Sequence, residues 1–212
     1  MLNSIDLHGG LVTRLWNMFI GWGSVGVVYA LTSALQGQGI TLPETALDRM
    51  ISFNPVGIWA YLSFFALIPY AYLSIDLHKI RWLRSAMQVS ALVCGAAFLI
   101  WPTTLTYPAI SGEGLSQRLL RFLSSADTSQ NCLPSLHGAL TLLCIWAIQD
   151  TKRKAHSGFI ILWGVLIFFS ILQLRRHITI DLGAGLIVGT LCGWLCMHWT
   201  KAGHSVGIQR TI

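Results

Sequence analysis

Long apolar runs alternate with short polar connections along this chain. Each run is close to the ~20 residues that a helix needs to cross a bilayer. Six such segments lack Asp, Glu, Lys and Arg: 15–35, 56–75, 85–101, 132–149, 157–174 and 182–200. Because a backbone in hydrocarbon must satisfy its own hydrogen bonds, and the alternation of barrel strands is absent, the runs predict helices. We therefore expect an all-α integral membrane protein, one six-transmembrane-helix bundle over residues 1–212.

Composition agrees with this class. The 212 residues are 54% hydrophobic and 10% charged, whereas soluble domains carry about 25% charged residues. The five cysteines are an odd number without a CxxC pair, so they indicate neither a disulfide framework nor a zinc site.

The distribution of basic residues predicts the orientation in the membrane. With both termini in the cytoplasm, nine of the 14 Lys and Arg lie in inner loops and tails, and five lie in outer loops. This asymmetry favours an N-in, C-in topology, in a plasma or inner membrane. The net charge of +6 follows largely from this asymmetry, and no basic run is long enough to indicate nucleic acid as a partner.

Two long outer loops contain patterns typical of short interfacial helices. The loop 36–55 includes LPETALDRM, with Pro43 suited to a first helical position. The loop 102–131 includes GLSQRLLRFL, whose apolar residues have helical spacing and whose Arg118 and Arg121 share another side. These arginines either snorkel to the headgroup layer or face a phosphate.

The last span carries Gly185, Gly189 and Gly193. Small residues at this spacing let two helices approach closely. We therefore expect these glycines to pack against another helix.

Polar clusters precede two of the spans. Residues 131–140 read NCLPSLHGAL, and residues 174–185 read LRRHITIDLGAG. One helical hairpin separates the clusters, so both should lie on the outer face. Of the seven histidines, only His137 and His177 fall at that face.

The second cluster contains a histidine with a carboxylate one helical turn away. Asp181 follows His177 by four residues, so the carboxylate can accept the histidine's N–H and leave the other ring nitrogen free as a nucleophile or base. A structural hydrogen bond is the simpler interpretation of such a pair. Arg175 and Arg176 add two positive charges whose geometry suits phosphate oxygens.

The first cluster resembles an anion site at a helix N-terminus. Pro134 suits the first turn of a helix, and the amides of Ser135, Leu136 and His137 would then face outward. Ser135 adds a hydroxyl donor and His137 a proton source. An interfacial histidine without catalytic role is the simpler interpretation, but together the clusters predict phosphate transfer at a membrane surface.

With PSLH and HITID in view, the chain resembles the type 2 phosphatidic acid phosphatase superfamily of six-span lipid phosphate phosphatases and phosphotransferases. The resemblance rests on Pro134, Ser135 and His137 (PSxH) and on His177 and Asp181 (HxxxD). It implies that His177 attacks phosphorus to form a phosphohistidine, that Asp181 orients it and that His137 protonates the leaving group. Ser135 and neighbouring amides would hold the phosphate, with no metal or other cofactor.

The chain departs from the family pattern at two places. The first motif, a Lys six residues before an Arg-Pro pair, is absent because 102–131 contains no Lys, so Arg118 or Arg121 would have to substitute. Ile171 stands where the third motif usually has Arg, which makes Arg175 the better candidate. This context, with Leu136 in place of glycine, resembles the branch of sphingomyelin and inositol phosphorylceramide synthases.

Three functions follow as alternatives. The first is a lipid phosphatase acting on a phosphomonoester or pyrophosphate lipid at the extracytoplasmic or lumenal face. The second is a lipid phosphotransferase, in which an alcohol replaces water as the acceptor. The third, a six-span transporter, is disfavoured because the spans are nearly free of charges. The particular lipid, its headgroup and the oligomeric state have no readable mark in the sequence.

Overall fold

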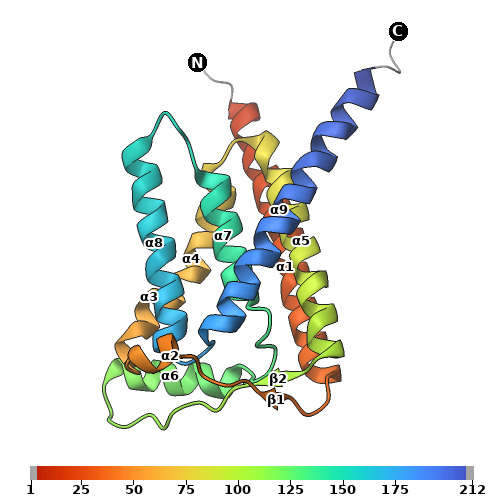
Figure 1. Ribbon diagram of the computed structural model, residues 1–212. Coiled ribbons are helices and arrows are strands. Elements are labelled where there is room, and N and C mark those ends of the chain that lie inside the picture. Colours follow the sequence, from red (N-terminus) through yellow and green to blue (C-terminus); the bar gives the residue numbers. More distant parts are fainter. Residues whose placement is uncertain (1–3, 209–212) are drawn as a thin grey trace.

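The computed structural model describes residues 4–208, and the side chains of residues 10–199, as a helical bundle with a layer of loops across one end (Figure 1). The first residues of α1 and the last residues of α9 lie at the opposite end. In chain order the elements are α1 (Ser4–Leu35), β1 (Ile40–Thr41), α2 (Ala46–Met50), η1 (Pro55–Gly57), α3 (Ile58–Leu62), α4 (Phe64–Ser74), α5 (Leu77–Ile100), β2 (Thr103–Thr104), α6 (Leu115–Ala126), α7 (Leu136–Ile148), α8 (Lys154–Gln173) and α9 (Thr179–Ile208).

Five predicted spans correspond to helical segments that are long and apolar enough to cross a membrane. Within the described residues these are Gly10–Leu35, Pro55–Ser74, Leu77–Ile100, Lys154–Gln173 and Thr179–Trp199. The protein is therefore an all-α, multi-pass membrane protein. Its outward faces agree with a lipid environment, because large apolar side chains such as Phe19 and Ile100 are 70% and 85% exposed.

Two of the helical segments differ from the predicted ones in their bounds or continuity. The predicted segment 56–75 consists of η1, α3 and α4 in succession. The helix α5 begins at Leu77 rather than at residue 85, because Lys79, Arg81 and Arg84 extend its first turns and charge alone does not end a helix.

The fourth predicted span, 132–149, contains the shorter helix α7 of 13 residues. At ~1.5 Å per residue this helix is ~20 Å long, less than the ~30 Å hydrocarbon core. The six-span count and the N-in, C-in orientation therefore stay predictions. The expected helical position of Pro134 is wrong, since Ser135 is the N-cap and Pro134 precedes it.

The helix α7 lies at the centre of the bundle, in contact with α4, α5, α8 and α9. Most of its residues are buried, as expected of a helix that is apolar on all sides. The predicted glycine ridge packs here: a Cβ added to Gly189 would lie 2.9 Å from the Ala139 carbonyl oxygen, and one added to Gly185 would overlap the Ser135 carbonyl. Glycine is thus what lets α7 and α9 come so close.

The loop layer joins segments that are distant in sequence. The strands β1 and β2 pair in parallel, with Ile40 opposite Thr103, and Thr104 forms an antiparallel bridge with Gln130. Each predicted loop helix has a counterpart, α2 and α6, whose placement in the headgroup layer stays a prediction. The helix α2 begins after Thr45 rather than at Pro43, because the Thr45 side chain caps the helix.

Candidate active site

The two polar clusters meet at the loop end of the bundle. The Ser135 N–H donates to the backbone oxygen of Asp181 at 2.8 Å, which ties the start of α7 to the start of α9. Ser135 is fully buried, and its Oγ accepts the Gly138 N–H at 3.2 Å as an N-cap. Ser135 lines neither of the two cavities described below, and a direct contact of its hydroxyl with phosphate stays a prediction.

His177 and Asp181 form a hydrogen-bonded pair. The Asp181 carboxylate lies 2.8 Å from His177 Nδ1 through one oxygen and accepts the Ile178 N–H at 2.9 Å through the other. Asp181 is fully buried and His177 is 6% exposed. Because the carboxylate holds Nδ1, His177 Nε2 is the ring nitrogen left for chemistry.

The turn between α8 and α9 sends its two arginines to different places. Arg175 has a left-handed backbone with φ 55°, and the N–H groups of Arg175 and Arg176 donate to the carbonyls of Leu172 and Ile171, both at 3.1 Å. This is a Schellman motif with arginine where glycine is usual. The Arg175 side chain turns to the loop 36–55, where it donates to the Ile51 carbonyl at 2.9 Å.

Arg176 is the predicted arginine that enters the site. Its guanidinium is 2.5 Å from the Asp127 carboxylate and 3.3 Å from Ser124 Oγ, and it lies 4.1 Å over the Tyr107 ring. Burial acts to lower the pKa of Arg176, but Tyr107, Tyr61 and Asp127 outweigh burial and raise the pKa. The guanidinium is therefore a permanent positive charge beside His177.

His137 faces His177 across a small gap. The two ring centroids are 5.8 Å apart, and His137 Nε2 lies 3.0 Å from the Tyr61 hydroxyl. His137 is the second residue of α7, so its own N–H and that of Leu136 have no acceptor within the helix. The arrangement places the two imidazole rings opposite each other.

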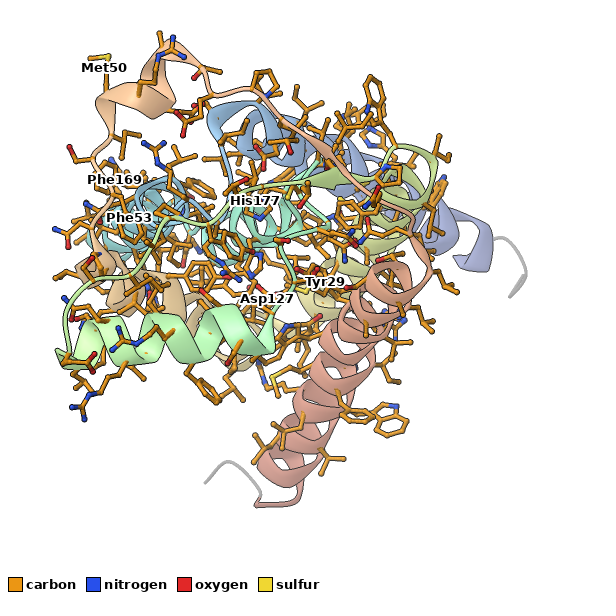
Figure 2. The ribbon with its side chains drawn as sticks, turned by 90° about the horizontal axis from the view of Figure 1, so that it is seen from below. Tyr29, Met50, Phe53, Asp127, Phe169 and His177 are labelled. Atoms are coloured by element: carbon orange, nitrogen blue, oxygen red, sulfur yellow. The ribbon has the colours of Figure 1, made fainter. Side chains whose placement is uncertain are left out.

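Two adjoining cavities surround these groups. A polar recess of about 10 Å³ is lined by both histidines and Arg176, together with Tyr107, Thr128 and Gln130. An apolar cavity of about 290 Å³ adjoins it and includes Leu136 in its lining. Four residues line both cavities and so mark the passage between them: Tyr29, Tyr61, Asp127 and His137. In the view from below, Asp127 and Tyr29 lie side by side (Figure 2), and the Tyr29 hydroxyl donates to Asp127 at 3.0 Å.

The arginines of α6 lie elsewhere. Arg121 binds Glu113 at 2.9 Å and the Gly112 carbonyl at 2.9 Å, and Arg118 lies 3.9 Å from the same Glu113. Neither arginine lines the polar recess. Their contacts brace the preceding loop, so in the structure they are not brought together with the histidines.

Sequence reasoning missed Asp127 and the three tyrosines of the recess, Tyr29, Tyr61 and Tyr107. Asp127 is one of only eight acidic residues and lies in the long loop 102–131, which was a usable signal. The tyrosines come from three distant segments, and no local pattern distinguishes them from membrane-interface aromatics.

A buried histidine–aspartate pair, a second histidine and a helix start whose first two amides have no acceptor within the helix lie near one arginine, and together they suit phosphoryl transfer inside a membrane protein. The sequence profile of the PAP2 superfamily matches residues 44–195, more than half of the chain. The chain therefore belongs to the PAP2 superfamily, as the PSLH and HITID motifs predict. Membership indicates a phosphatase or phosphotransferase that acts on phosphorylated lipids. No curated protein matches the chain.

Proposed function

We propose that this protein is a membrane lipid phosphatase that hydrolyses a phosphomonoester or pyrophosphate lipid at the outer face through a phosphohistidine. One observation carries the proposal: His177, paired with Asp181 at 2.8 Å, and His137, 5.8 Å away between ring centroids, line one recess with Arg176. This arrangement supports the predicted roles and requires no metal ion for any step.

In the first step His177 Nε2 attacks phosphorus, forming an N–P bond as the P–O bond to the lipid breaks. The leaving oxygen takes a proton from His137, which lies on the opposite side of the recess. In the second step water attacks phosphorus, His137 takes the water's proton, and the N–P bond breaks to release phosphate. Asp181 stabilises the positive charge that develops on the His177 ring.

We assign Arg176 to the phosphate oxygens, together with the amides of Leu136 and His137 at the start of α7. The recess of about 10 Å³ has room for about one water molecule. A phosphoryl group therefore has to displace the Asp127 carboxylate from Arg176, exchanging one anion for another. Arg176 stays paired in both states.

The apolar cavity of about 290 Å³ is the place we assign to the lipid chain next to the scissile bond. Its walls come from α1, α3, α4, α6 and α7, and Trp22, Phe64 and Leu140 are among the apolar side chains lining it. A chain held there brings its headgroup to the passage beside His137. The cavity thus supports a lipid rather than a soluble phosphate ester as substrate.

The test is release of labelled phosphate from a mixed pool of lipid phosphates and pyrophosphates by protein in detergent with EDTA. We compare the wild type with His177→Ala and with His198→Ala, which changes an exposed histidine on α9. Release that survives EDTA, persists in His198→Ala and disappears in His177→Ala is the expected result. Release that EDTA abolishes, or that His177→Ala retains, overturns the proposal.

Lipid phosphotransfer is the second candidate, because a recess of about 10 Å³ admits little water while the adjoining apolar cavity of about 290 Å³ admits a second lipid. The same phosphohistidine, attacked by a lipid or headgroup alcohol, would give transfer. Adding alcohol acceptors to the assay separates the two functions. Acceptor-dependent product with little free phosphate supports the transferase, as the synthase-like HITID context predicts.

A further inference from the structure

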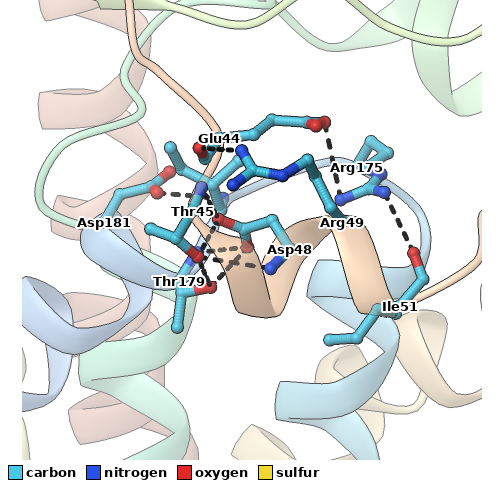
Figure 3. Close-up of polar contacts among 9 residues, drawn as sticks. Glu44, Thr45, Asp48, Arg49, Ile51, Arg175, Thr179 and Asp181 are labelled. Carbon is cyan, nitrogen blue, oxygen red and sulfur yellow. Dashed lines mark hydrogen bonds and ion pairs between the residues drawn. The ribbon is translucent and has the colours of Figure 1, made fainter.

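The outer loop carries a buried carboxylate that none of the proposed chemical steps uses. Asp48 is fully buried although it lies on α2, a helix of only five residues. One oxygen of its carboxylate accepts the Thr179 N–H at 2.8 Å and the Thr179 hydroxyl. The other accepts the Thr45 N–H at 2.8 Å and the Thr45 hydroxyl at 2.7 Å (Figure 3). Among the described residues, every hydrogen bond to this carboxylate thus comes from a neutral donor on one of two threonines.

Thr179 is the first residue of α9 and lies between His177 and Asp181. The first N–H groups of a helix have no acceptor within it. Asp181 takes the N–H of Ile178 at 2.9 Å, and Asp48 takes the next one from another element. A negative charge at a helix N-terminus is also favourable for the helix dipole. The start of α9 is therefore capped by the outer loop as well as by its own side chain.

The same loop also binds the chain on the N-terminal side of His177. Arg175 donates to the Ile51 carbonyl at 2.9 Å and lies 3.6 Å from the Glu44 carboxylate. These contacts involve the residue two before His177, and the Asp48 contacts involve the residue two after it. The segment that carries His177 is thus bound on both flanks to residues 44–51, as Figure 3 shows.

We propose that Asp48 is a positioning residue for the reaction: by docking α2 onto the first residue of α9, it holds His177 at the angle and distance required for attack on phosphorus. The assignment rests on the proposed phosphoryl transfer at His177. Asp48 lines neither cavity, so it acts through Thr179 and not on the substrate.

Two substitutions test the contact from its two ends. Asp48→Ala removes the acceptor, and Thr179→Val removes the donor hydroxyl while keeping the shape of the side chain. A nucleophile displaced by ~1 Å loses ~100-fold in rate, so we expect kcat to fall by about 10- to 100-fold in both variants. KM should stay within about twofold, because neither cavity changes.

Three further measurements separate positioning from a general loss of folding. Thr179→Ser restores the hydroxyl and should recover most of the wild-type kcat. Asn54→Ala is the matched control, because Asn54 caps η1 in the same outer loop through the Val56 N–H and does not touch α9. Hydrogen exchange at the Thr179 amide, which requires no activity, should accelerate about tenfold in Asp48→Ala and stay unchanged in Asn54→Ala.

The proposal is supported when kcat falls with KM unchanged, Thr179→Ser rescues, and exchange accelerates at the start of α9 only. It is overturned if Thr179→Val keeps wild-type kcat, or if Asp48→Ala leaves exchange at Thr179 unchanged. Should Asp48→Ala fail to fold, Thr179→Val decides alone. Failure of the proposed function is recognised separately, because the wild type and Asn54→Ala would then also form no phosphoenzyme.

Discussion

The hydrogen bond between Asp181 and His177 allows a sharp test of the proposed nucleophile. In Asp181→Asn one carboxylate oxygen becomes an amide nitrogen while the shape is kept. If that NH₂ faced the Ile178 N–H, two donors would meet in a buried site, which costs about 1 to 3 kcal/mol. The amide therefore orients its oxygen to Ile178 and its NH₂ to His177 Nδ1, where the carboxylate now lies 2.8 Å away.

This orientation reverses the tautomer of His177. With an NH₂ donor opposite it, Nδ1 must accept, so the proton moves to Nε2, the nitrogen that should attack phosphorus. A protonated Nε2 has no lone pair for the attack. In hydrolases with an analogous histidine–aspartate pair, this reversal lowers kcat by about 10⁴. We expect a loss of about 10³ to 10⁴ in kcat, equivalent to about 4 to 5.5 kcal/mol in the barrier.

The assay is single-turnover rapid quench with a labelled lipid phosphate, which follows the acid-labile phosphoenzyme and the released phosphate. Both should slow by the same factor in Asp181→Asn. Asp150→Asn is the matched control, because Asp150 lies in the loop between α7 and α8 at the other end of the bundle and accepts the Lys152 N–H at 2.9 Å. It should react at the wild-type rate.

Thermal unfolding completes this test. Asp181→Asn keeps the bond to Ile178, so the protein should lose only about 1 to 2 kcal/mol of stability and remain folded at the assay temperature. Retention of more than about a tenth of the wild-type kcat by folded Asp181→Asn would falsify the tautomer argument and with it the role of His177.

Three further predictions concern other parts of the molecule. His137→Gln should lower kcat by about 10²- to 10⁴-fold for a lipid phosphate, whose alkoxide leaving group needs a proton, but by far less for a nitrophenyl phosphate, whose leaving group needs none. Equal losses with both substrates exclude His137 as the general acid. Gly185→Ala should lower the midpoint of thermal unfolding by several degrees, because the new Cβ would overlap the Ser135 carbonyl. Gly183→Ala is the control, because its Cβ would have no atom within 4 Å. Equal midpoints for the two variants would refute the close approach of α7 and α9. For Asp48, burial acts to raise the pKa of the carboxyl, but the bonds from Thr179 and Thr45 outweigh burial and lower it. The stabilisation by the Asp48 carboxylate is therefore fully present above the unfolded-state pKa of ~3.9 and is lost as pH falls through the folded-state pKa. In thermal unfolding, the difference in stability between wild type and Asp48→Asn should therefore narrow below about pH 4. A difference that does not depend on pH contradicts this.

The helices were predictable because their signal is local. A charge-free apolar run of about 20 residues has one stable conformation in hydrocarbon, whatever its neighbours are. The length of α7 was less predictable, since the apolar run from 132 to 149 does not show that Ser135 caps the helix and leaves 13 residues. Where a helix begins depends on which side chain accepts its first free N–H groups. At α9 one of these acceptors, Asp48, comes from a distant part of the chain.

The arginines of the candidate site also show what the sequence predicts and what it does not. The sequence identifies four candidates, Arg118, Arg121, Arg175 and Arg176, with identical charge and similar surroundings. Of these four, only Arg176 lines the recess. The left-handed backbone at Arg175 turns the side chains of Arg175 and Arg176 in different directions, whereas Arg118 and Arg121 contact Glu113. No property of a single arginine in the sequence carries that information.

The sequence by itself determined the membrane class and the separation of PSLH and HITID by one helical hairpin, because hydropathy is a short-range property. It also gave the four-residue spacing of His177 and Asp181, but the expected helical turn between them is wrong, since His177 lies in the turn before α9. Only the tertiary structure decided that Asp127 holds Arg176, that Tyr61 contacts His137 and that Asp48 caps α9. The two residues in these contacts are separated along the chain by 49, 76 and 131 positions, respectively. Contacts at such separations depend on how the helices and loops pack together, and no local pattern of residues encodes that packing.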